Sequence, residues 1–116
     1  MRAKGSHSIY GNLDLLVLRS IEAEGPIHGL GVMDSIESTS QGDLEVDDGA
    51  LYRCLHRLEQ RGLLTSEWRM SEKGRQAKFY LLTPTGEKQL VSGRTEWERH
   101  VRAVGRVLGL DLEVVP

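Results

Sequence analysis

Apolar residues recur along the chain with two different periods, and the change of period divides the sequence into elements. Three stretches with helical spacing come first, two short alternating stretches follow, and helical spacing returns after Pro84. The helical stretches are residues 13–24, 28–42, 48–61 and 84–110, and the alternating ones are residues 63–68 and 77–82. The pattern has no internal repeat and predicts a mainly α protein with one small β-hairpin.

The first helix carries apolar residues on more than one side. Asn12 stands where an N-cap residue is common, and Gly25 with Pro26 ends the helical spacing. Leu15 and Leu18 widen the apolar face, so this helix is expected to pack against more than one neighbour. We therefore expect these two leucines to contact a second subunit.

Capping residues mark the start of two further helices. Asp47 or Asp48 is placed to accept free N–H groups at the start of the third helix, and Gly62 is placed to end it. Thr83 is the expected cap of the last helix, because Pro84 follows it at the first helical position, where a missing N–H costs nothing.

The third helix has one apolar and one polar side. At about 100° per residue, its apolar stripe consists of Leu51, Leu55 and Leu58, with Cys54 at the margin. The polar side presents Gly49, Ala50, Arg53, His56, Arg57 and Gln60, with Tyr52 and Glu59 on one flank. The single cysteine, Cys54, is expected to be a small buried apolar residue rather than a reactive thiol.

The positions of the charged residues along the chain say more about possible partners than the net charge does. The chain of 116 residues is long enough for one compact domain, and its net charge is −2. Residues 1–50 hold three basic and nine acidic side chains, whereas residues 51–80 hold seven basic and three acidic ones. Because salt confines each charge to a reach of about 10 Å, a partner that selects positive potential would meet the middle of the chain.

The sequence also predicts where the protein works. No apolar run is long enough to cross a bilayer, and residues 1–12 lack the hydrophobic middle of a signal peptide. We expect a cytoplasmic protein.

Three helices followed by a hairpin is the order of a winged helix-turn-helix domain. In that fold the third helix enters the major groove of DNA, and the hairpin, or wing, touches the flanking backbone. We place the DNA-binding domain at residues 10–83 and a C-terminal dimerisation helix at residues 84–110.

The polar side of the third helix carries the residue types that DNA recognition needs. We expect close backbone approach at Gly49 and Ala50, guanine contacts by Arg53 and Arg57, weaker polar contacts by His56 and Gln60, and a phosphate contact by Tyr52.

The hairpin adds a second basic surface around Gly74. Its expected DNA-contacting residues are Arg69, Lys73, Arg75 and Lys78. The alternative for each of them is an ordinary solvated charge. Trp68, at the end of the first strand, is expected to pack in the core or the hairpin rather than to stack on a base.

The last helix carries a short apolar seam. Its residues are spaced by seven, four, three and four positions, and they are Leu90, Trp97, Val101, Val104 and Leu108. Arg94 interrupts the seam, so it needs help from the first helix. Because a lone helix would leave the stripe in water, we expect a homodimer whose symmetry spaces two recognition helices about one turn of DNA apart.

Three strings of the sequence resemble the PadR family of bacterial transcriptional regulators: "GPIHGLGVMDSIE", "DDGALYRCLHRLEQRGLL" and "YLLTPTGEKQL". The resemblance covers residues 11–109 and is closest to the short members with a single C-terminal helix. It implies a winged-helix dimer that binds palindromic operators, usually represses transcription, and is often released by an effector. It also implies DNA contacts by Tyr52 and the wing residues Lys73, Arg75 and Lys78.

Two positions depart from the family pattern. Many members have Ser or Thr where this chain has Ala50, and Pro where it has Arg53, so one hydroxyl is missing and one cation is added. The operator sequence therefore cannot be inferred from relatives. Trp97 stands where some drug-sensing members place an interface tryptophan, which suggests a small planar hydrophobic effector; the alternative is a tryptophan that only packs.

Other classes of function have less support. The histidines His7, His28, His56 and His100 are far apart in the sequence, and there is no nucleophile or phosphate-loop motif, so neither an enzyme nor a metal or cofactor site is expected. The serious alternative is a winged-helix protein-interaction module that does not bind DNA, which would be expected to show an apolar third helix on its outer side.

Overall fold

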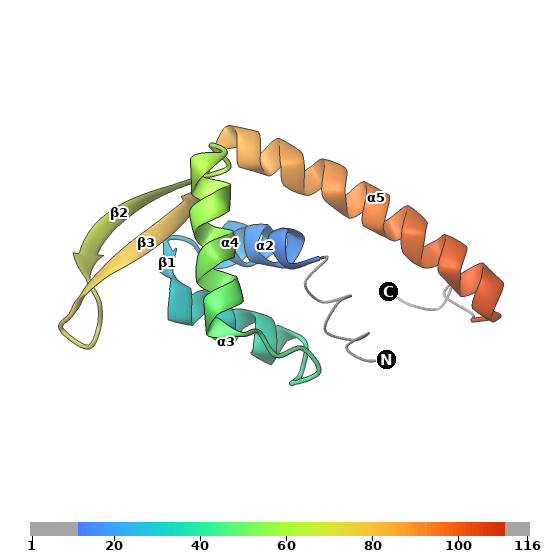
Figure 1. Cartoon of the computed structure of the whole chain (residues 1–116), viewed down its shortest axis with the longest axis horizontal. Coiled ribbons are helices and arrows are strands. Elements are labelled where there is room, and N and C mark those ends of the chain that lie inside the picture. The colour runs from blue at the N-terminus through green and yellow to red at the C-terminus, as the bar shows by residue number, and fades with distance from the viewer. Residues whose placement is uncertain (1–11, 111–116) are drawn as a thin grey trace.

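The computed structural model of the chain describes residues 12–110, and it confirms the expected fold class (Figure 1). The elements are α2 (Leu13–Glu24), β1 (Ile27–His28), α3 (Gly29–Thr39), α4 (Asp48–Gln60), β2 (Leu64–Met70), β3 (Gln76–Leu82) and α5 (Pro84–Leu108). Figure 1 shows the β2–β3 hairpin projecting to one side of the helical body, and α5 running out to the other side. Residues 10 and 11 of the expected domain and His7 lie outside the described residues.

The sheet has three antiparallel strands in the order β1-β3-β2, one strand more than the sequence predicts. The additional strand, β1, pairs Ile27 with Tyr80 and His28 with Phe79. A strand of two residues is too short to show alternation, so no periodic signal marked it. β1 ties the start of α3 to the base of the hairpin.

The core forms where α2, α4 and the start of α5 meet. The whole predicted stripe of α4 is fully buried, including Cys54. Val17 and Ile21 of α2, Val32 and Ile36 of α3, and Leu90 of α5 are buried in the same core. Gly86, in the first turn of α5, lies directly against the carbonyl of Leu63, a place that no larger residue fits without movement. The first turns of α5 therefore belong to the winged-helix body.

The helix starts follow the capping expectations with one exception. Asp47 accepts a hydrogen bond from the Ala50 N–H, at 2.9 Å. Thr83 accepts one from the Gly86 N–H, also at 2.9 Å, and donates to the Gly62 carbonyl. Asn12 occupies the N-cap position of α2, but its side chain makes no capping hydrogen bond.

Among residues 12–110, no helix has the length and apolar character needed to cross a membrane.

Candidate nucleic-acid interface

The outer face of α4 is polar and open to solvent. Gly49, Arg53, His56 and Gln60 are all exposed, on the side opposite the buried stripe. Asp47 holds the first turn in place, so the face begins at a capped helix N-terminus. These four residues lie together as the sequence predicts.

Two residues expected on that face lie at its edge instead, toward α2. Ala50 is half-buried and packs against the core. Arg57 donates a hydrogen bond to Asp14, in the first turn of α2. Together with Arg53, these two residues border a notch of about 310 Å³ between the starts of α2 and α4. Arg57 is therefore paired with a carboxylate, whereas the sequence alone predicted a free cation.

Asp14 also contacts a second residue of α4 and the residue that follows the helix. The Cys54 thiol donates to its Oδ1 atom at 3.2 Å, and Arg61 Nη1 lies 3.7 Å from its Oδ2 atom. Burial, followed by the hydrogen bond to Asp14 and the charge of Asp14, raises the pKa of Cys54 to about 12, so the thiol stays protonated. Sequence reasoning missed Asp14, because nothing local in the sequence marks a contact between residues 43 positions apart.

Tyr52 lies against the first residue of α3. A Cβ atom added at Gly29 would stand 2.5 Å from Cε1 of the tyrosine ring and 2.6 Å from its hydroxyl. Glycine at this position makes room for the ring, which keeps an exposed edge on the flank of α4. The hydroxyl thus lies beside the start of α3.

The basic residues of the wing divide into a free tip and a paired base. At the tip, Lys73 and Arg75 are exposed on either side of Gly74, whose φ of 78° favours glycine. Neither cation forms an ion pair within the part of the chain that the structure describes. Arg69 pairs with Glu67 and lies over the ring of Phe79, 5.1 Å from its centroid.

Lys78 joins the base of the wing to α4. Its Nζ atom lies 2.9 Å from Oε1 of Glu59, which also accepts a hydrogen bond from Ser66. The Ser66 hydrogen bond and the Lys78 contact hold the pKa of Glu59 below its usual value, and the same contact raises the pKa of Lys78. Lys78 therefore braces the wing, and it is less available for DNA than the sequence predicts.

Trp68 lies in the hairpin and does not pack in the core, which was one of its two expected places. The side chain is 67% exposed, and every residue of β2 after Ser66 is exposed. Its cross-strand neighbour is Lys78. An exposed tryptophan thus lies on the wing between the base and the tip.

Two residues of the predicted subunit interface are not accessible to a second subunit. Leu18 and Leu90 are fully buried within the single chain, so they belong to its core and cannot reach a partner. Leu15 and Val101 are half-buried. The members of the seam that remain open are Trp97 (41% exposed), Val104 (40%) and Leu108 (65%).

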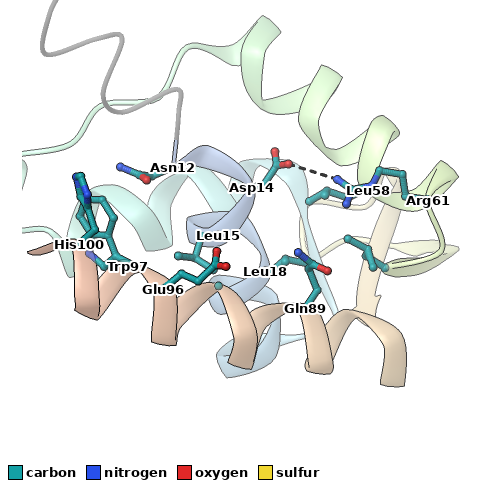
Figure 2. Close-up of a pocket in the computed structure, with 12 residues that line it drawn as sticks. Asn12, Asp14, Leu15, Leu18, Leu58, Arg61, Gln89, Glu96, Trp97 and His100 are labelled. Atoms are coloured by element: carbon teal, nitrogen blue, oxygen red, sulfur yellow. Dashed lines mark ion pairs between the residues drawn. The ribbon is translucent and has the colours of Figure 1, made fainter.

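A groove of about 410 Å³ runs between α2 and α5 and reaches the end of α4 (Figure 2). Trp97 and His100 lie side by side at one end, with ring centroids 5.5 Å apart, and Asp14 with Arg61 borders the end near α4. The helices approach closely at Gly93, where a Cβ would stand 2.6 Å from Cδ1 of Leu15. No group of three metal-binding side chains comes together among the described residues.

Comparison with known proteins agrees with this architecture. The family described as "Transcriptional regulator PadR-like family" matches residues 17–92. The transcriptional regulator Rv3488 of Mycobacterium tuberculosis is 37% identical over 82 residues, which cover 71% of this chain and 73% of that protein.

Two solved structures share the fold. A PadR family transcriptional regulator from Eggerthella lenta has a TM-score of 0.75 at 26% identity, covering 92% of this chain and 90% of that one. A transcriptional regulator from Clostridium thermocellum has a TM-score of 0.77 at 24% identity, covering 86% and 96%. The family match begins within α2 and ends in the first turns of α5, and it covers more than half of the chain, so the chain belongs to the PadR-like family of transcriptional regulators.

Proposed function

We propose that this regulator binds a palindromic DNA operator as a homodimer, with α4 in the major groove and the wing on the flanking backbone, and that it represses transcription. The observation that carries the proposal is the pairing of two exposed basic surfaces on an otherwise acidic chain. One is the outer face of α4 with Arg53, and the other is the wing tip with Lys73 and Arg75. A protein-interaction module would favour an apolar outer face on α4.

The two surfaces have different tasks in this proposal. Arg53 takes part in none of the ion pairs among residues 12–110. Its guanidinium can bridge O6 and N7 of guanine. Lys73 and Arg75 neutralise phosphates, which adds affinity and salt dependence without selecting sequence. Residues 10–83 together with the first turns of α5 would form the DNA-binding domain, and the outer part of α5 would form the dimerisation helix.

The support for a homodimer is the apolar stripe on the outer part of α5. Trp97, Val104 and Leu108 lie on one side of this helix and remain open in the single chain. A second copy of the same stripe, related by a twofold axis, would cover them and place the two α4 helices on successive turns of the duplex.

We also propose that a small planar hydrophobic molecule acts as effector beside Trp97. The groove between α2 and α5 supports this idea, because it has the volume of a small-ligand site and Trp97 with His100 offers flat aromatic surfaces. Titration of planar dyes should quench Trp97 fluorescence in a Trp68→Phe variant. Unchanged fluorescence would leave Trp97 as a packing residue only.

The test of DNA binding is selection from random duplexes at two salt concentrations, followed by sequencing of the bound fraction. Enrichment of a palindrome supports the proposal, and Arg53→Ala should then lower and relax that enrichment. Arg99→Ala is the matched control, since Arg99 is an exposed cation on the side of α5 away from the apolar stripe. Weak binding without enrichment that vanishes as salt rises would favour the protein-interaction module instead.

A further inference from the structure

Asp14 borders the groove between α2 and α5 and belongs to neither proposed DNA-binding surface, yet its carboxylate is shared by Cys54 and Arg57 of α4 and by Arg61, which follows the helix. We propose that Asp14 restrains Arg57 and thereby lowers the affinity of α4 for DNA, so that this residue of α2 sets how strongly the recognition helix binds. The inference rests on the proposed DNA-binding function.

The contacts define the restraint. Arg57 and the Cys54 thiol both donate to Oδ1 of Asp14, and Arg61 Nη1 stands 3.7 Å from Oδ2. Arg57 is thus drawn toward the start of α2, at the edge of the polar face of α4. Arg53, one turn earlier on α4, has no such partner among the described ion pairs.

The restraint competes directly with DNA. A guanine edge or a phosphate needs the same guanidinium N–H donors that Asp14 accepts, and the carboxylate itself repels phosphates. Arg57 and Asp14 are 51% and 38% exposed, so water screens the pair and DNA can displace it at a small cost. Asp14 therefore tunes affinity and does not abolish it.

A single substitution can remove the charge of Asp14 and keep the shape of its side chain. Asparagine has the shape of aspartate, and its amide oxygen can still accept from the Cys54 thiol. Asp14→Asn would then remove the charge that holds Arg57 and Arg61 and leave both cations available near the duplex.

Fluorescence anisotropy with a duplex taken from the selection experiment tests this inference. We expect Asp14→Asn to bind about two- to fivefold more tightly than wild type at low salt, the range of a weak surface ion pair. Glu22→Gln is the matched control, because Glu22 is a second paired carboxylate of α2 that contacts Arg19 and Arg94 and no residue of α4. It reports the general effect of removing one negative charge.

The role of Arg57 is isolated by a double-mutant cycle. In an Arg57→Ala background, Asp14→Asn should change affinity no more than Glu22→Gln does, and Arg57→Ala should cost more affinity in the Asp14→Asn background than in wild type. Thermal melting establishes that each variant is folded, and Asp14→Ser replaces Asp14→Asn if the asparagine variant is not.

The outcomes separate this inference from the proposed function. If wild type binds a palindrome through Arg53 and Asp14→Asn fails to exceed Glu22→Gln, or exceeds it equally without Arg57, the restraint is overturned and DNA binding stands. If wild type binds no duplex specifically, the proposed function fails, and the inference fails with it.

Discussion

Helix α4 buries its entire apolar stripe within the chain, whereas α5 buries only the first part of its own. Leu51, Leu55 and Leu58 are fully buried, and α4 packs against α2, α3 and β2. On α5, Leu90 is buried, whereas Val104 and Leu108 are exposed to solvent. The two helices have similar local patterns, so periodicity predicts which face is apolar but not which molecule covers it. The winged-helix body supplies the cover for α4, and a second copy is proposed to supply it for the outer part of α5.

The largest expected effect tests the buried helix. Leu55→Ala should lower the free energy of unfolding by about 2–5 kcal/mol, because it leaves a cavity in a fully packed site. Leu30→Ala is the matched control, since Leu30 of α3 is an exposed leucine. Urea unfolding measures both variants, and equal losses would show that α4 is not the centre of the core.

The next prediction tests the open stripe of α5. Val104→Asp should weaken the homodimer by more than about a hundredfold, because twofold symmetry would bring two desolvated carboxylates together. Sedimentation velocity across a range of concentrations measures the change, and far-UV circular dichroism should show the helices intact. Thr95→Asp, an exposed position on another side of α5, is the control. Wild type that sediments as a monomer at every concentration would remove the basis of the dimer proposal.

A smaller effect separates the tip of the wing from its base. Lys73→Ala should reduce the slope of log affinity against log salt by about one, because one phosphate contact is lost. Lys78→Ala should reduce it less, since Lys78 is paired with Glu59. Duplex binding at four or five salt concentrations gives the slopes. The opposite order would mean that Lys78 leaves Glu59 for a phosphate.

The smallest expected effect is the pH dependence of the stability that the Glu59–Lys78 ion pair adds between α4 and the wing. Because the pKa of Glu59 is lowered in the folded chain, the stability it adds is present above its ordinary pKa of 4.5 and is lost as the pH falls through the lowered value. The pair is partly exposed, so the loss should be less than about 1 kcal/mol. Thermal melting of wild type and Glu59→Gln between pH 7 and pH 3 measures it, and a difference that does not change with pH would contradict this origin.

The sequence was sufficient for the elements and for the buried face of α4, since both depend on local periodicity and capping. It predicted the α4 stripe, Thr83 as a cap, either Asp47 or Asp48 as the other cap, and both strands of the hairpin. It missed β1, which is too short to show a period.

The differences between the expected and the observed surroundings of the candidate site residues come from long-range contacts. Helical periodicity alone places Arg57 on the polar side of α4. Its position at the edge of that side allows it to contact Asp14 on another helix. Lys78 and Glu59 are likewise joined only by the fold. Leu18 and Leu90 were assigned to a partner because the sequence could not show that their own chain already covers them.

Asp14 borders the groove between α2 and α5 and also holds Arg57 of α4. A molecule that binds in this groove and alters the charge available from Asp14 would be energetically linked to the recognition helix. Such linkage is reciprocal: whatever factor the molecule applies to DNA affinity, DNA must apply to the affinity of the molecule. Under the proposed function, binding of the operator would then change the affinity of the groove for its ligand. DNA-bound protein and free protein would therefore respond to different ligand concentrations.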